Sequence, residues 1–135
     1  MTKIKLTFAI FGDLLNPKLF TEIVKLSPTS FWFKGDAIPN RKPGLTRKET
    51  CWEYSFGFIH TLFFDDVTNL FVQHFNQHLE DIIKYINKNN LETKIDVIVE
   101  IINDEKPALS LDKDFISLVV KMNGEIDIDL YYIDE

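Results

Sequence analysis

The stretch TCWEYSFGFI, residues 50–59, alternates between large aromatic side chains and smaller or charged ones. Its even-numbered positions from 52 onward are all aromatic: Trp52, Tyr54, Phe56 and Phe58. The odd-numbered positions between them include Glu53 and Ser55. A period of two residues is typical of a β-strand with one buried face. We therefore predict a strand over these residues, with its four aromatic side chains turned toward a core.

Four further segments are expected to form strands. Three of them repeat the alternation of apolar and polar residues, and the fourth is a short aromatic run. They are residues 4–10, Ser30 to Lys34, Lys94 to Ile102 and Glu125 to Ile133. The chain has twelve Phe residues, so the core that these strands share should be rich in aromatic rings.

Three helices are expected between the strands. Asn16-Pro17 is typical of a helix N-cap followed by proline in the first turn, which predicts a helix to about Leu26. A broad apolar stripe predicts a long helix from Asp65 to Asn89, and a short one should span Asp112 to Met122. The order β-α-β-β-α-β-α-β predicts a single α+β domain over residues 1–135. Its mostly antiparallel five-stranded sheet would carry helices on one face.

The other face of this sheet should be open and polar. Its expected members are Lys3, Lys5, Thr7, Glu53, Ser55, Asp96, Glu100, Asp127, Asp129 and Tyr131. Opposite charges on neighbouring strands can pair across such a face. This face is the main functional surface that the sequence predicts.

Charge is distributed unevenly along the chain, whose net charge is −6. Residues 1–90 carry 11 basic and 9 acidic side chains, a balance of +2, whereas residues 91–135 carry 4 basic and 12 acidic ones, a balance of −8. An acidic end disfavours nucleic acid and anionic membranes and favours a basic protein partner. Acidity that only keeps the protein soluble is an equally open interpretation.

Composition also bears on location. The single cysteine, Cys51, cannot form an internal disulfide, which agrees with a reducing compartment. No apolar run approaches the length of a membrane span. We therefore expect a cytoplasmic protein that does not bind a membrane.

The segment SPTSFWFKGD, residues 27–36, contains three aromatic residues beside a charged turn. In an alternating strand, Phe31 and Phe33 would point one way and Trp32 the other. The favoured interpretation is a strand entering the core, and the alternative is an aromatic anchor for a partner. The loop that follows, residues 36–49, holds the only basic cluster of the chain.

Several segments resemble one bacterial family. They are GDLLNP (residues 12–17), SPTSFWFKGD (residues 27–36), Trp52 and PALSLDKDFISLVVKMNGEIDIDLY (residues 107–131). Together they resemble the family catalogued as domain of unknown function 4279, over nearly the whole chain. The resemblance implies a small bacterial α+β domain that sits among contact-dependent toxin–immunity genes. It implies no catalytic or binding residues.

No constellation of residues predicts catalysis, a cofactor or a metal. His74 and His78 have helical i,i+4 spacing, but a third metal ligand is not evident, and packing at the edge of the apolar stripe is the simpler interpretation. Asp127 and Asp129 could act as paired carboxylates or could be ordinary solvated strand residues. Cys51 has no evident histidine partner. Whether the protein is an enzyme stays open, with the balance against it.

The leading functional hypothesis is a non-enzymatic protein-binding domain, in the form of an immunity protein that neutralises a basic toxin. The predicted partner-binding residues are Trp32, Lys34, Asp36, Glu100, Asp127, Asp129 and Tyr131. One alternative is a small-ligand binder or enzyme with a pocket near Trp32, Trp52 and His74 or His78. Another is a domain that self-associates through a strand edge; the sequence does not predict the oligomeric state.

Overall fold

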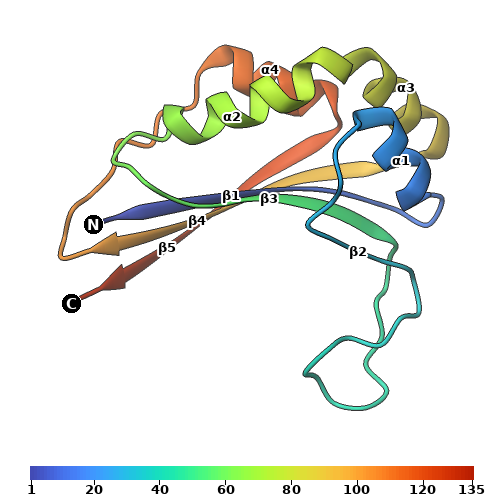
Figure 1. Ribbon diagram of the computed structural model, residues 1–135, viewed down its shortest axis with the longest axis horizontal. Coiled ribbons are helices and arrows are strands. Elements are labelled where there is room, and N and C mark those ends of the chain that lie inside the picture. The colour runs from blue at the N-terminus through green and yellow to red at the C-terminus, as the bar shows by residue number, and fades with distance from the viewer.

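A computed structural model describes all residues, 1–135, and has the predicted α+β architecture. Its five-stranded sheet has the order β2-β3-β1-β4-β5, and every pair of neighbours is antiparallel except β4 and β5 (Figure 1). The strands are β1 (Lys3–Phe11), β2 (Ser30–Trp32), β3 (Cys51–His60), β4 (Glu92–Ile102) and β5 (Gly124–Ile133). The predicted order of elements along the chain is confirmed.

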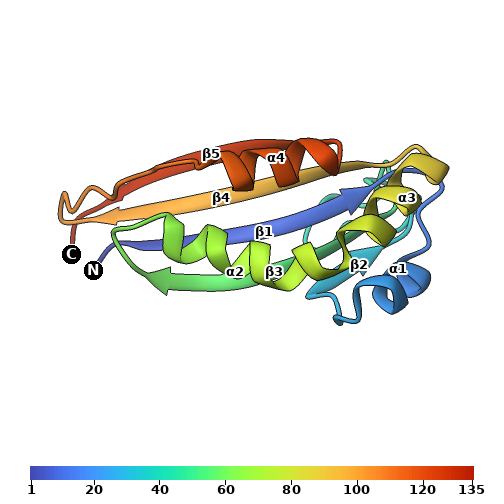
Figure 2. The ribbon, with the colours of Figure 1, turned by 90° about the horizontal axis from the view of Figure 1, so that it is seen from above.

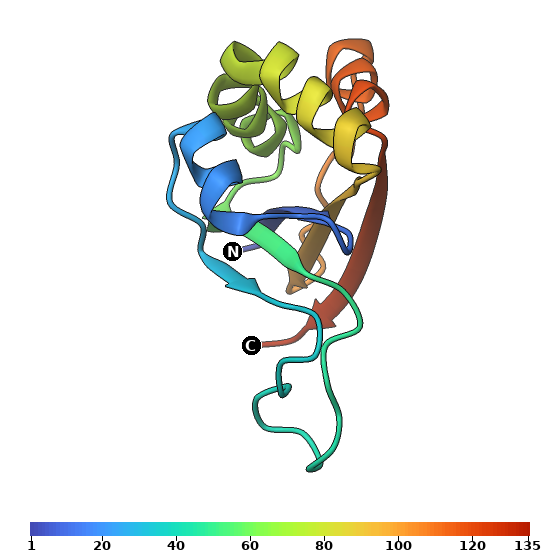
Figure 3. The same ribbon diagram turned by 90° about the vertical axis from the view of Figure 1, so that its right-hand side faces the viewer.

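All helices cover the same face of the sheet and leave the other face without helices (Figures 1 and 3). They are α1 (Pro17–Val24), α2 (Asp65–Phe75), the 3₁₀ turn η1 (Asn76–His78), α3 (Leu79–Asn89) and α4 (Lys113–Lys121). Seen from above, α2 and α4 lie along the strands (Figure 2). None of these helices has both the length and the apolar character that crossing a lipid bilayer requires.

Side-chain caps start two of the helices. The Asn16 Oδ1 atom accepts a hydrogen bond from the Leu19 backbone N–H at 3.2 Å, as predicted for α1. At α4 the Asp112 Oδ1 atom accepts one from the Phe115 N–H at 2.8 Å. These bonds satisfy N–H groups that would otherwise lack partners in the first turn.

The predicted continuous helix from Asp65 to Asn89 is wrong in one respect, because η1 interrupts it. The break lies at Asn76-Gln77-His78, where Asn and His have low helix propensity. It separates α2 from α3, and both contribute buried residues to one core, among them Phe71, Phe75, Ile82 and Ile86. A single straight helix has less freedom to follow the twist of the sheet beneath it.

The core between helices and sheet is built around aromatic rings. Phe8, Trp52 and Phe75 are fully buried, with 4.6 Å between the Phe8 and Phe75 ring centroids. Phe20 of α1 packs edge-to-face on Trp52 at 4.8 Å. The Trp52 Nε1–H donates to the Thr21 hydroxyl at 3.0 Å, so the buried indole leaves no unpaired donor.

A β-bulge corrects the prediction for Phe58. The pairing of β1 with β3 shifts register between Lys5 and Thr7, and Gly57 adopts a left-handed φ of 73°. The extra residue reverses the alternation of β3 beyond this point. Phe58 therefore lies on the open face, where the Lys3 and Lys5 ammonium groups lie 4.7 and 5.0 Å from its ring centroid.

The helix layer covers β5 only in part. The nine residues of α4 span about 14 Å at 1.5 Å per residue, whereas the ten residues of β5 span about 33 Å. Ile126 and Ile128 pack against the core, but Leu130 and Tyr132, which were predicted to face it, are 47% and 65% exposed. The C-terminal half of β5 thus has no cover on the helix side.

Candidate functional site

The open face of the sheet carries the polar residues that the sequence predicted there. The register places Thr7 beside Asp96, and Asp96 beside Asp127. Two ion pairs cross the strands: Lys94 Nζ to Asp127 Oδ2 at 2.7 Å, and Lys3 Nζ to Glu100 Oε1 at 3.4 Å. Acidic side chains outnumber basic ones in the sheet part of this face: Glu53, Asp96, Glu100, Glu125, Asp127 and Asp129 against Lys3, Lys5 and Lys94. The face is therefore acidic, most of all along β5.

The loop between β2 and β3, residues 33–50, projects on the helix-free side of the sheet (Figures 1 and 3). Its two limbs are tied together, since Ala37 bridges Thr46 and the Arg47 N–H donates to the Asp36 carbonyl at 2.7 Å. Between this loop and the strands lies a groove of about 460 Å³, and we call it the loop groove. Its lining includes Trp32, Arg47, Cys51, Glu53, Lys94 and Asp96.

Trp32 forms one wall of the loop groove instead of entering the core. It pairs with Cys51 of β3, so it lies on the opposite side of the sheet from Trp52. The Arg47 guanidinium lies 3.8 Å from the centroid of the Trp32 ring, a cation–π contact. The buried Arg47 Nε atom has no hydrogen-bond partner. The favoured prediction, that this strand enters the core, is wrong.

The strand β2 is also shorter than the predicted Ser30 to Lys34. The Asp36 carboxylate accepts a hydrogen bond from the Phe33 N–H at 2.8 Å, which closes a turn directly after Trp32. Phe31 and Phe33 are 53% and 50% exposed. The aromatic residues of this segment are therefore largely exposed, and the tryptophan buried in the core is Trp52 of β3.

Two half-buried carboxyl groups lie at the sheet side of the loop groove. Burial raises the pKa of Glu53, and the nearby Asp96 carboxylate adds to that rise. Burial also raises the pKa of Asp96, although Lys94 opposes the change. Glu53 has no salt-bridge partner within 4 Å, and the Lys94–Asp96 contact is long, at 3.9 Å. A cation placed near this pair would stabilise both charged forms.

The thiol of Cys51 lies under the loop groove and is buried. Burial, with a further contribution from the Glu53 carboxylate, raises its pKa to about 12. A thiol with such a pKa is protonated near neutral pH and is a poor nucleophile.

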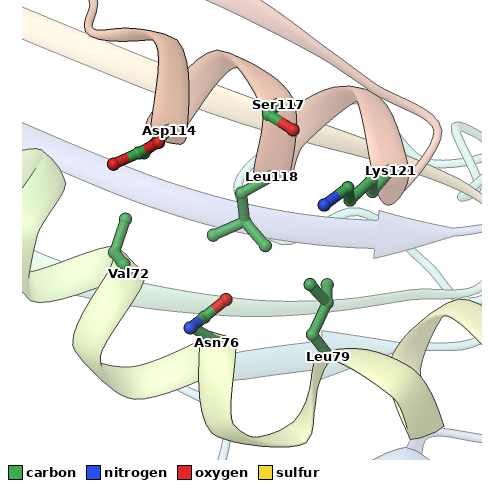
Figure 4. Close-up of a pocket in the computed structure, with 7 residues that line it drawn as sticks. All are labelled: Val72, Asn76, Leu79, Asp114, Ser117, Leu118 and Lys121. Carbon is green, nitrogen blue, oxygen red and sulfur yellow. The ribbon is translucent and has the colours of Figure 1, made fainter.

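A second, smaller groove of about 290 Å³ separates α4 from α2 and η1 (Figure 4). Asp114, Ser117 and Lys121 of α4 face Val72 and Asn76 across it (Figure 4). Four of its seven lining residues are polar: Asn76, Asp114, Ser117 and Lys121. It offers no nucleophile–base pair.

His74 and His78 lie on the helix side of the sheet, away from the loop groove. The His74 ring packs against Phe56 at 5.1 Å, and its Nδ1 lies 2.7 Å from the Leu70 carbonyl oxygen. His78 lies in η1. Because Trp32 and Trp52 are on opposite faces, the pocket that was expected to unite Trp32, Trp52 and His74 or His78 does not form. No three His, Cys, Asp or Glu side chains converge as metal ligands would.

The predicted partner-binding residues fall into separate groups. Lys34 and Asp36 lie at the base of the loop, where Lys34 Nζ pairs with Asp13 at 3.1 Å. Glu100 and Tyr131 are neighbours near the opposite end of the sheet. Asp127 and Asp129 lie on β5 between these ends, and Asp127 reaches Lys94 of the loop groove.

Sequence reasoning placed Glu53 and Asp96 on the open face but did not single them out as site residues, and it missed Arg47 and Lys94. The signals available were the alternation of the strands for Glu53 and Asp96 and the basic cluster for Arg47. The sequence could not predict that the loop folds back over the sheet, because the position of the loop depends on contacts between residues distant in sequence.

Comparison with known proteins addresses the family and not the activity. No curated protein and no solved structure matches the chain. The family model described as "Domain of unknown function (DUF4279)" matches residues 2–133, nearly the whole chain. The resemblance seen in the sequence is confirmed, and the chain belongs to the DUF4279 family.

Proposed function

We propose that this protein is a non-enzymatic binding domain that holds a basic partner protein against the open face of its sheet. The observation that carries the proposal is the acidic, helix-free face, on which Asp129 and Glu125 have no ion-pair partner. A basic surface would supply the missing counter-charges. The acidic C-terminal third would also accelerate association by electrostatic steering.

The specific form that we propose is an immunity protein that neutralises a basic toxin in the bacterial cytoplasm. Its support is the charge of residues 91–135, which carry 4 basic and 12 acidic side chains. Steering of this kind gives fast complex formation that weakens as salt screens the charges.

Affinity capture tests the proposal. The wild-type protein, used as bait in a lysate of the native bacterium, should retain a basic partner, and raising the salt should release it. An Asp127→Lys/Asp129→Lys bait should lose it. A matched control, Glu22→Lys/Glu80→Lys, makes the same change of charge on exposed residues of α1 and α3. Retention by the first variant, or equal loss with the control, would count against the open face.

A second candidate function is the binding of a small ligand in the loop groove. The specific observation in its favour is Arg47, whose guanidinium stacks on Trp32 while its Nε lacks a partner. A planar anionic ligand in the loop groove could pair with the Arg47 guanidinium, which lines the groove. Such a ligand should change the fluorescence of wild-type protein but not of the Trp32→Phe variant, in which buried Trp52 is the remaining fluorophore. A ligand screen in which the two proteins respond alike would remove this candidate.

A further inference from the structure

The strand β5 forms an open edge of the sheet. Its neighbour on one side is β4, and no strand or loop pairs with the other side. Carbonyl oxygens at both ends of β5 accept hydrogen bonds from the β4 side: Asn103 N–H to Ile133 O at 2.9 Å, and Thr93 N–H to Asn123 O at 3.2 Å. Backbone groups alternate in direction along a strand, so the odd-numbered residues bond toward β4. The N–H and C=O groups of the even-numbered residues therefore point outward: Ile126, Ile128, Leu130 and Tyr132.

The outer edge of β5 lacks the usual backbone protection against pairing. Natural edges are blunted by proline, lysine, bulges or shortness. The opposite edge strand, β2, has three residues, whereas β5 has ten. The β5 register with β4 runs without a shift from Gly124 to Ile133, and the strand contains neither proline nor lysine. Its acidic side chains are the one feature that restricts which strands can pair with it.

The two flanks of this edge differ in chemistry. On the open face lie Glu125, Asp127 and Asp129. On the helix side Leu130 and Tyr132 are exposed.

The helix α4 extends the apolar flank. Its residues Asp114, Ser117 and Lys121 face α2 and η1. At 100° per residue, Ile116 and Val120 are turned about 130° and about 90° away from the mean direction of those residues, and both are exposed. A strand added here would meet carboxylates on one side and apolar groups on the other.

We propose that the β5 edge accepts an extended segment of the partner protein as a sixth strand, with Lys or Arg on alternate residues facing Asp127 and Asp129. Apolar residues of that segment, at the intervening positions, would pack beside Leu130 and Tyr132. This inference rests on the proposed function and adds the mode of binding to it. Main-chain hydrogen bonds would supply affinity, and the alternating side chains would supply specificity.

A second copy of this chain fits the edge poorly. Symmetric antiparallel pairing of two β5 strands centred on Ile128 sets Asp127 of each copy opposite Asp129 of the other. Like charges directly opposite each other destabilise a strand pair. The same carboxylates favour a basic strand. The charge of β5 therefore favours a basic partner protein over a second copy of this chain.

Hydrogen exchange of the full-length protein, followed by NMR, tests the inference. The probe is the peptide acetyl-KVKVKVK-amide; acetyl-DVDVDVD-amide and the block peptide acetyl-KKKKVVV-amide are the controls. At saturation, exchange should slow about tenfold or more at the outward amides of Ile126, Ile128, Leu130 and Tyr132, because the added strand must leave before they exchange. Odd-numbered amides, already bonded to β4, should change little. The control peptides should give no protection.

Three variants check the backbone and side-chain contacts of the added strand separately. Leu130→Pro removes an outward N–H without removing a bond to β4, so it should fold and lose the protection; Leu130→Thr, which keeps the N–H, should retain it. Circular dichroism should show that both Leu130 variants fold. Asp127→Lys/Asp129→Lys should reverse the preference toward the aspartate peptide.

The outcomes separate the inference from the proposed function. A basic partner captured equally well by wild type and by Leu130→Pro would uphold the function and overturn strand addition. Binding of the lysine peptide without protection of the even-numbered amides would also overturn it. Protection by the lysine peptide, combined with failure to capture any basic partner, would support the edge site and count against the proposed function.

Discussion

The two faces of the sheet use adjacent residues of the same strands for opposite purposes. On the helix side, Phe8 and Trp52 are fully buried in an aromatic core. On the open side, Glu53 and Asp96 are half-buried carboxyl groups whose pKa values burial raises. Trp52 and Glu53 are neighbours in sequence, yet the first stabilises the fold, whereas burial disfavours the charged form of the second. Alternate positions of one strand thus face the core and the proposed binding surface.

The largest expected contrast between the faces is between the two tryptophans. Trp52→Ala should lower the free energy of unfolding by about 3–5 kcal/mol, because it leaves a cavity among the rings of Phe8, Phe20 and Phe75. Trp32→Ala should cost about 1 kcal/mol or less, since Trp32 lies on the open side. Urea unfolding followed by circular dichroism measures both. Equal losses would contradict the assignment of the two residues to different faces.

The bulge that moves Phe58 from one face to the other should depend on Gly57. Gly57→Ala should cost about 1–2 kcal/mol, because a Cβ atom is unfavourable at its φ of 73°. Gly57→Asn should cost less, since asparagine tolerates the left-handed region better. Thermal unfolding of the three proteins gives the order. If alanine proved neutral, β3 would have to run without the bulge, with Phe58 on the helix side.

Alkaline pH should weaken the fold through Cys51, which lies on the open face beneath the loop. Its folded pKa is about 12 against an ordinary 9.0, so between these values the unfolded chain loses the thiol proton first. Stability should therefore fall as pH rises above 9, by up to about 1.4 kcal/mol per pH unit. Unfolding of wild type and Cys51→Ala between pH 8 and 10.5 isolates this contribution as their difference. A difference that does not vary with pH would mean that the thiol is not buried as described.

The smallest expected effect is a gain of stability on the open face. Glu53→Gln should slightly raise the melting temperature at pH 7, because it removes a charge that burial and Asp96 disfavour. The folded pKa is raised, so the cost of the charge appears as pH rises above the ordinary value of 4.5 and is absent below it. The gain should disappear near pH 4. A loss of stability at pH 7 would show that the Glu53 carboxylate has a cationic partner in the fold.

The sequence predicted most of the architecture, and its errors have identifiable causes. The capped start of α1 at Asn16 and the strand β4 follow from local patterns and are confirmed. Phe58 was assigned to the wrong face because a bulge is invisible to a simple period of two. The strand that holds Trp32 was expected to enter the core, because the sequence does not reveal that Arg47, fifteen positions later, stacks on Trp32.

By itself the sequence determined which side chains share a face along each regular stretch of strand, because the alternation follows from the stereochemistry of an extended backbone. The bulge at Gly57 is the exception. The sequence likewise determined the acidic character of the C-terminal third. Tertiary structure decided that β5 lies parallel to β4 at the edge, and that the loop of residues 33–50 turns to the helix-free side. Strand order and loop placement depend on contacts between distant segments. Local sequence patterns do not predict the free energies of those contacts. The proposed site depends on both. The sequence supplies the acidic residues of β5, and the fold leaves the edge of that strand unpaired.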